Sequence, residues 1–179
     1  MKLVIIRHGQ TDANLRGIVQ GASIDTSLNF IGTTQAEMAG FNLKSYGFPV
    51  IYSSMMKRAK ETADILAQYS QGCKIVPILG LEEVHFGEAE GMLSKKASEM
   101  YKDIFDAIDN GNFDINIPKG ETVNQSLERA LKSLQSIKLL STNPVVGVVT
   151  HGTLMYNLHY HFFKNKRHFD NCEYFEIDI

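Results

Sequence analysis

Two arginines and two histidines stand close to the points where apolar stretches of the sequence end. Arg7 and His8 directly follow the run LVII, His151 follows VVGVVT, and Arg58 comes soon after VIYS. Positive charge at the end of a buried strand is unfavourable unless an anion is bound beside it. Arginine presents forked donors to phosphate oxygens, and a neutral histidine can attack phosphorus and carry the phosphoryl group. The sequence therefore predicts a site for a phosphate dianion.

A carboxylate and two glycines complete this set of residues. Glu82 and Glu83 follow the apolar stretch KIVPILGL, and a carboxylic acid beside a phosphate ester can protonate the leaving oxygen. Gly9 and Gly152 each follow one of the two histidines, where the lack of a side chain lets a ligand approach the backbone. A nucleophile and an acid suffice for phosphoryl transfer, so neither a metal ion nor a cofactor is expected.

The elements that must position these residues alternate between strand-like and helix-like patterns. Apolar runs predict strands over residues 2–6, 50–53, 74–79, 145–150 and 173–179. Periodic apolar residues predict helices over residues 32–45, 55–66, 97–108 and 123–137, and a short helix from 153. Asn29 is expected to cap the first helix, and Pro77 indicates an edge strand. This alternation is typical of an α/β fold with a mostly parallel sheet, where ligands bind beyond the carboxyl ends of the strands.

Length and composition narrow the class of protein. The chain has 179 residues, of which 44% are hydrophobic and 21% charged, with a formal net charge of −2. These values predict a single domain over residues 1–179 and provide no basic field for nucleic acid. Residues 87–121 contain the loop-like stretch DNGNFDINIPKG and are expected to form an insertion that covers the crevice. No secretory leader and no membrane span is expected, and Cys73 and Cys172 are expected to be reduced thiols in the cytoplasm. The sequence does not indicate an oligomeric state.

Six blocks, in this order, resemble the signatures of one known family. They are RHGQTDAN, GASIDTSLNFIGTTQA, IYSSMMKRAKETA, LEEVHFGEAEG, KGET and THG. Together they are similar to the histidine phosphatase superfamily, also called the phosphoglycerate mutase-like family. The resemblance covers nearly the whole chain and implies a three-layer α/β/α fold.

The resemblance also implies roles for individual residues. His8 corresponds to the nucleophile that becomes phosphohistidine, and Glu83 to the proton donor. The residues that correspond to phosphoryl or phosphate contacts are Arg7, Arg58, His151, Asn14, Gln20, Gly21 and Gly152. Ser27 replaces the usual proline of the family, and Thr153 follows the second His-Gly pair where some mutases have asparagine. Neither change removes a catalytic group.

The preferred interpretation is a metal-independent phosphatase that acts on a small phosphate ester, with no nucleic acid or membrane partner. A phosphoglycerate mutase is the first alternative. The mutases that the chain resembles place paired arginines between the glutamate block and the second His-Gly pair, whereas residues 87–121 contain four lysines and no arginine. A non-catalytic phosphate-binding protein is a further alternative, and a metal hydrolase is disfavoured because no H-E-x-x-H motif is present.

Structural roles are the simplest interpretation for several of these residues. Arg58 could be a surface residue of its helix, paired with Glu61 or Glu82. The histidines outside the six blocks, and His85 within one of them, are expected to be structural or exposed; these are His85, His159, His161 and His168. His85 lies two residues beyond Glu83, so its environment decides whether it takes part.

Overall fold

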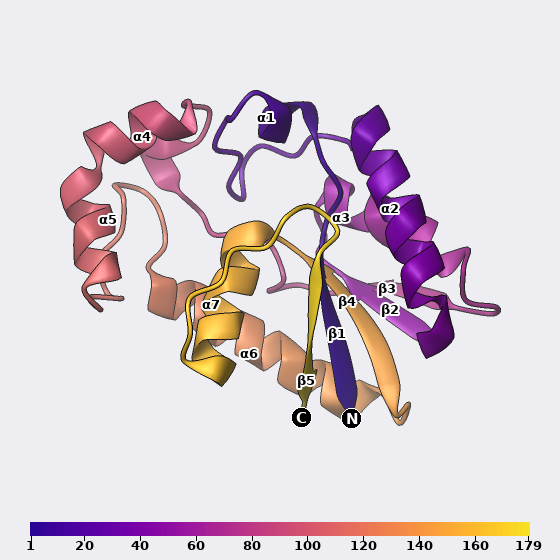
Figure 1. Cartoon of the computed structure of the whole chain (residues 1–179). Helices are drawn as coiled ribbons and strands as arrows, with labels where there is room; N and C mark the ends of the chain where they lie inside the picture. Colours follow the sequence, from indigo (N-terminus) through magenta and orange to yellow (C-terminus); the bar gives the residue numbers. More distant parts are fainter.

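The computed structural model describes all residues from Met1 to Ile179 and places five strands in one sheet (Figure 1). The strands are β1 (Lys2–Arg7), β2 (Val50–Ser53), β3 (Lys74–Pro77), β4 (Val145–Thr150) and β5 (Tyr174–Asp178). Their order is β3-β2-β4-β1-β5, with β1, β4, β2 and β3 parallel and β5 antiparallel to β1. The predicted mostly parallel sheet is confirmed, and β3, which ends at Pro77, is an edge strand.

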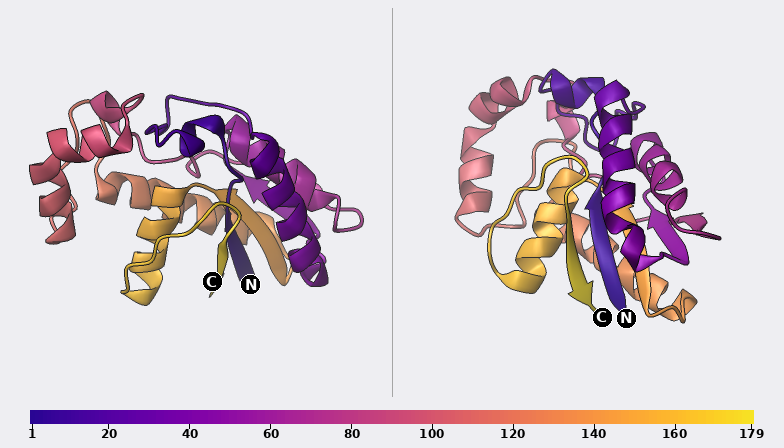
Figure 2. Two further views of the ribbon diagram at one scale, coloured as in Figure 1. Left: turned by 45° about the horizontal axis from the view of Figure 1, so that its top comes forward. Right: turned by 45° about the vertical axis from the view of Figure 1, so that its right-hand side comes forward.

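Helices cover both faces of this sheet (Figure 2). Helices α2 (Phe30–Leu43) and α3 (Lys57–Ala67) lie on one face, and α6 (Val123–Leu140) and α7 (Gly152–Phe163) on the other. Alternate residues of β1 divide between two cores, because Val4 and Ile6 pack with α2 and α3, whereas Leu3 and Ile5 pack with α6 and α7. The fold therefore has the predicted α/β/α layers. None of the helices combines the length and hydropathy needed to cross a membrane.

Local signals explain where these helices begin. The side-chain oxygen of Asn29 accepts a hydrogen bond from the Gly32 amide at 2.8 Å, so α2 starts at Phe30, slightly before the predicted residue. Thr122 and Gln125 form a reciprocal capping box at the start of α6. Helix α7 runs for 12 residues and is longer than the short helix that the sequence predicts.

The segment between Glu83 and α6 differs most from the prediction. The single helix expected over 97–108 is wrong: α4 (Ser94–Met100) and α5 (Lys102–Asp109) are separated by Tyr101, whose φ and ψ are −111° and 28°. Tyr101 packs against a small cluster centred on Ala97 and Ile117, which turns the chain at this point. Three short elements were not predicted: α1 (Asp12–Leu15), the 3₁₀ turn η1 (Lys44–Tyr46) and the 3₁₀ turn η2 (Gly87–Ala89). Helices α4 and α5 extend beyond the end of the sheet (Figure 2).

Candidate active site

The nine residues singled out from the sequence gather at the carboxyl ends of the parallel strands. β1, β4 and β2 are neighbours in the sheet, so the chain segments that follow them lie side by side. A cavity of about 240 Å³ is lined by Arg7, His8, Asn14, Gln20, Gly21, Arg58 and Glu83. His151 is fully buried and lines neither cavity, and its ring centroid is 5.1 Å from that of His8. Gly152 lines an adjoining cavity.

His8 is held so that one ring nitrogen is left available. Its side chain is 2% exposed, and Nδ1 lies 2.6 Å from the carbonyl oxygen of Gly9. Nδ1 must donate to that oxygen, which assigns the lone pair to Nε2. Burial lowers the pKa of His8 well below its ordinary value, and the charges of Arg58 and Arg7 lower it further. His8 is therefore a neutral imidazole with an unprotonated Nε2.

Arg58 is a buried residue that joins His8 to the loop after α1. Its side chain is 1% exposed, and Nε donates to His8 Nε2 at 3.3 Å. The two terminal nitrogens donate to the carbonyl oxygens of Gly21 and Ile24, each at 2.9 Å. The alternative of a surface arginine paired with Glu61 or Glu82 is wrong, because α3 turns Arg58 inward at the end of β2. Glu61 instead accepts from the Leu28 amide at 2.7 Å.

Two buried nitrogens, one on Arg7 and one on His151, lack a partner within the chain. Arg7 donates from Nη1 to the Phe169 carbonyl at 2.5 Å, but its Nε has no acceptor. A Cβ atom at position 152 would lie 3.0 Å from that Nε, so glycine at this position leaves the space beside Arg7 Nε free. Nδ1 of His151 is also unpartnered. A buried donor without an acceptor is unfavourable, so an oxyanion bound beside Arg7, which lines the cavity, would satisfy its Nε.

Ser54 contacts His151 and was not predicted as a site residue. Its hydroxyl lies 2.9 Å from Nε2 of His151, and its oxygen also accepts from the Met56 amide. Ser54 Oγ can donate to His151 Nε2 while it accepts from the Met56 amide, and with the hydroxyl as donor the ring proton of His151 is on Nδ1. Burial lowers the pKa of His151 well below its ordinary value. The signal in the sequence was the position of Ser54 directly after the strand VIYS.

Glu83 is fixed by backbone amides at the start of α7. Its side chain is 8% exposed, Oε2 accepts from the Thr153 amide at 3.0 Å, and Oε1 accepts from those of Leu154 and Val84 at 3.0 and 2.9 Å. The partial positive charge of this helix terminus favours a carboxylate there. Glu82 lines neither cavity: its Oε2 accepts from the Gly80 amide and faces Arg129 at 3.8 Å. Of the two glutamates, Glu83 faces His8.

Asn14 and Gln20 present amide donors to the same space. Asn14 Oδ1 accepts from the backbone and hydroxyl of Thr11, both at 3.0 Å, and Gln20 Oε1 accepts from the Thr26 hydroxyl at 2.8 Å. With their oxygens occupied and their amide nitrogens free of any partner in the chain, both side chains can donate to an anion. Together with the two arginines they make the cavity a cluster of donors.

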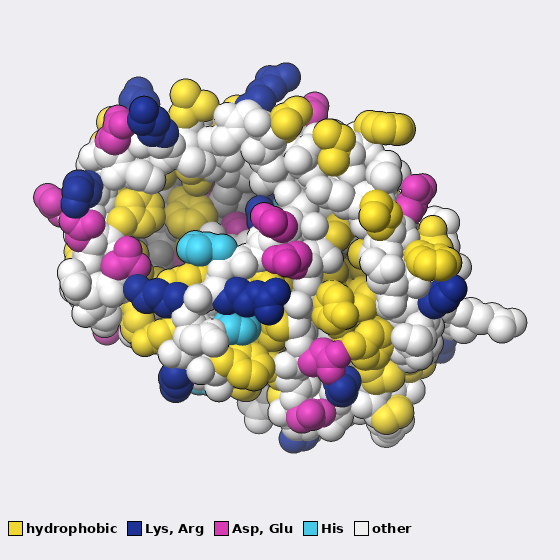
Figure 3. Space-filling model, viewed as in Figure 1, with side chains coloured by type: hydrophobic (Ala, Val, Ile, Leu, Met, Phe, Trp, Pro, Cys, Tyr) yellow, Lys and Arg dark blue, Asp and Glu magenta, His cyan; other side chains and the backbone are white.

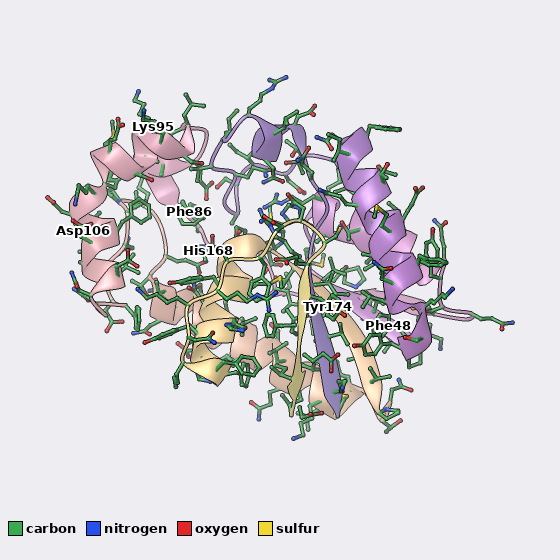
Figure 4. All side chains as sticks on the ribbon, in the orientation of Figure 1. Phe48, Phe86, Lys95, Asp106, His168 and Tyr174 are labelled. Atoms are coloured by element: carbon green, nitrogen blue, oxygen red, sulfur yellow. The ribbon has the colours of Figure 1, made fainter.

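A second cavity, of about 560 Å³, adjoins the first. The residues common to both linings are Arg7, Glu83, Phe86, Phe105 and Thr153. Figure 3 shows a hollow on this face of the molecule with hydrophobic side chains on its walls. Phe86 lines both cavities, and in Figure 4 it lies between α4–α5 and α7. An ester bound at His8 would therefore extend past Glu83 into the larger cavity.

The other histidines lie outside the donor cluster. His85 accepts from the Gly87 amide at 3.0 Å and lies 3.3 Å from Ser23 Oγ, so it ties two loops together at the rim of the larger cavity. His159 is buried against Phe163, Phe169 and Phe175. His168 is exposed and lines the larger cavity. No group of three or more His, Cys, Asp or Glu side chains is placed to hold a metal ion.

Comparisons with known proteins agree with this geometry. The family model described as the histidine phosphatase superfamily (branch 1) matches residues 3–178. A metal-independent phosphoserine phosphatase of Arabidopsis thaliana is 33% identical over 156 residues, which are 86% of this chain but only 65% of the plant protein. Phosphoglycerate mutase-like protein 4 of the same plant is 31% identical over 160 residues, 88% of this chain and 69% of that protein. The solved structure of Bacillus stearothermophilus YhfR is 29% identical with a TM-score of 0.81, covering 92% of this chain and 80% of that one.

Proposed function

This chain belongs to the histidine phosphatase superfamily, and we propose that it hydrolyses a small phosphate monoester through a phosphohistidine formed on His8. The observation that carries the proposal is the state of His8. Its Nε2 is unprotonated and faces a cavity that also holds two arginines and a carboxyl group. The names of the relatives support phosphatase activity, and the reaction needs no metal ion or cofactor.

The reaction proceeds in two displacements at phosphorus. In the first, the lone pair of His8 Nε2 forms the N–P bond while the bond from phosphorus to the ester oxygen breaks. Glu83 passes to the leaving oxygen a proton that the ester brings when it binds as its monoanion. In the second, water attacks phosphorus, Glu83 takes a proton from it, and the N–P bond breaks. Inorganic phosphate is released together with that proton, and His8 and Glu83 return to their starting states.

The remaining polar groups stabilise the charge on the phosphoryl oxygens. Arg7 Nε and His151 Nδ1 are donors without a partner, and Arg58 can transfer its Nε hydrogen bond from His8 to an oxygen. The amide nitrogens of Asn14 and Gln20 add neutral donors. Donors already held in place by the fold lower the barrier because they need little reorganisation during the reaction.

Hydrolysis is favoured over mutase activity by the positions of the lysines in 87–121. None of Lys95, Lys96, Lys102 and Lys119 lines either cavity. Lys102 pairs with Asp106 and Lys119 with Glu88, both on the outside of this segment, and Figure 4 shows Lys95 on the outer side of α4. A bisphosphate intermediate that must reorient would have no second cluster of cations to hold it.

Three further features belong to the proposal. We expect residues 1–179 to act as one domain, with 87–121 covering the crevice, and we expect no nucleic acid or membrane partner. Cys73 and Cys172 are both free thiols, which is typical of a reducing compartment, and this supports a cytoplasmic location.

A screen of phosphate monoesters in metal-free buffer containing a chelator tests the proposal. We expect catalytic release of phosphate from at least one ester, with the activity abolished in His8→Ala. Activity that disappears with the chelator and returns with a divalent metal would contradict the mechanism, and binding without turnover would indicate a phosphate-binding protein. Interconversion of 2- and 3-phosphoglycerate, with 2,3-bisphosphoglycerate supplied, at a rate far above hydrolysis would instead identify a mutase.

A further inference from the structure

The larger cavity offers more space than the phosphoryl site and a different chemistry. Its volume is about 560 Å³, against about 240 Å³ for the cavity around His8. The two meet at Glu83, the residue that would protonate the leaving oxygen, so the larger cavity is where the alcohol part of an ester would lie. A volume of this size is typical of sites for drug-sized ligands, and a three-carbon acid would leave most of it empty.

Aromatic rings from three parts of the chain face this space. Tyr156 and Tyr160 come from α7, His168 from the segment that follows it, and Phe113 from the segment after α5. The rings of Tyr156 and His168 stack at 4.9 Å with an angle of 25°, and Phe113 meets Tyr160 edge to face at 5.8 Å. Flat faces and ring edges of this kind pack well against another ring.

The charges around the larger cavity are unfavourable for a second anion. Arg7 and Lys166 are its only arginine or lysine side chains, against four carboxylates, those of Glu83, Asp109, Glu121 and Asp170. Arg7 serves the phosphoryl site, and Lys166 Nζ is held 3.0 Å from Asp109 Oδ1. No free cation is left to meet a carboxylate or a second phosphate on the alcohol.

We infer that the preferred substrate is an ester whose alcohol is bulky, carries a ring and has no second anionic group. The ring would lie in the larger cavity, between α5 and α7, while the phosphoryl group lies on His8. This inference rests on the proposed phosphatase function, but it makes a separate claim about which ester is used. It disfavours phosphoglycerates and bisphosphates as substrates.

Three primary alkyl esters with similar leaving oxygens test the claim. They are 3-phenylpropyl phosphate, glycerol 3-phosphate and 3-phosphoglycerate, compared by kcat/KM for phosphate release. Burial of the phenyl ring predicts an advantage of at least about tenfold over glycerol 3-phosphate. We expect 3-phosphoglycerate to be the poorest of the three, because its carboxylate would enter a cavity rich in carboxylates.

Two pairs of variants, each with a control outside the larger cavity, test whether residues of that cavity cause the preference among the three esters. Phe113→Ala should lower kcat/KM for the phenylpropyl ester about tenfold while changing glycerol 3-phosphate little, whereas Phe162→Ala, outside the cavity, should change neither. Asp109→Asn frees Lys166 and should raise kcat/KM for 3-phosphoglycerate by about threefold or more. Asp106→Asn is the control, since Asp106 is on the same helix but on its outer side, paired with Lys102 (Figure 4).

The possible failures are distinguishable. If 3-phosphoglycerate equals or exceeds the phenylpropyl ester, the inference is wrong while the phosphatase function stands. If Phe113→Ala affects all three esters equally, Phe113 supports the fold only, and the response of Asp109→Asn decides whether charge sets the preference. If Asp109→Asn also leaves the order of kcat/KM among the three esters unchanged, the larger cavity does not bind the alcohol part of the ester and the inference is wrong. If none of the esters releases phosphate, the proposed function itself fails.

Discussion

Arg58 Nε donates to His8 Nε2 at 3.3 Å, between two side chains that are almost completely buried. The contact does two things for His8. It aims the ring, whose other nitrogen is fixed on the Gly9 carbonyl, and it places a fixed positive charge beside the nitrogen that must stay unprotonated. An incoming phosphoryl oxygen can accept the same N–H as phosphorus approaches Nε2. The guanidinium of Arg58 thereby both orients His8 for attack on phosphorus and stabilises the negative charge on the phosphoryl oxygen.

Arg58→Lys tests this coupling. Lysine keeps the charge but cannot bond to His8, Gly21 and Ile24 at the same time, because it lacks the planar fork. We expect kcat/KM to fall about 100-fold or more for any ester. Arg16→Lys, at an exposed arginine, should leave kcat/KM unchanged. Near wild-type activity in Arg58→Lys would show that charge alone is sufficient.

The buried neutral histidines predict a loss of stability in acid. Burial lowers the pKa of His8 and of His151 well below the ordinary histidine value of about 6.5. Below that value, and until the lowered pKa is reached, the unfolded chain binds protons that the native chain does not. The free energy of unfolding therefore falls with decreasing pH, by about 1.4 kcal/mol per pH unit for each such histidine.

Urea denaturation between about pH 7 and pH 5 measures this slope. His8→Asn removes one of the two groups, so its free energy of unfolding should fall less steeply than that of the wild type. Phe162→Ala, which removes no titrating group, should keep the wild-type slope. Equal slopes for wild type and His8→Asn would mean that His8 is protonated in the native state over this range.

Glu83→Gln is expected to affect esters according to their leaving groups. Glutamine keeps a hydrogen-bonding side chain at the start of α7 but cannot donate a proton as an acid. Hydrolysis of an alkyl phosphate should fall about 100-fold or more, and that of p-nitrophenyl phosphate, whose leaving group needs no proton, should fall much less. Glu82→Gln should have little effect on either, since Glu82 lines neither cavity. An equal loss on both substrates would assign Glu83 a positioning role only.

The sheet and the donor cluster could be predicted because their signals are local in the sequence. Apolar runs that end in Arg7-His8 or in Thr150-His151 identify buried strands, and parallel strands bring their carboxyl ends together whatever else the chain does. Asn29 likewise identifies the start of α2 through a hydrogen bond within one turn. These features need no knowledge of distant contacts.

What the sequence did not predict depends on contacts between distant segments. The break at Tyr101 arises where residues of α4 and α5 pack on Ile117. The larger cavity combines Phe113, Tyr156 and His168, whose spacing in the sequence carries no pattern. His168 was expected to be structural or exposed, and only the tertiary structure places its ring against Tyr156 at the cavity wall. Substrate preference likewise depends on contacts between distant segments, so the sequence alone does not predict it.

The central claim is that the phosphoryl group of the ester is transferred to His8. Trapping the phosphohistidine intermediate tests this claim most directly. Wild-type protein is mixed briefly with an ester labelled in its phosphoryl group, quenched in base, digested and mapped by mass spectrometry. We expect an acid-labile phosphoryl group on His8, with the control His161→Asn, at a residue that lines neither cavity, labelled to the same extent. His8→Ala should carry no label and release no phosphate. A wild-type protein that turns over the ester without a phosphorylated His8, or a His8→Ala variant that keeps most of the activity, would contradict the account.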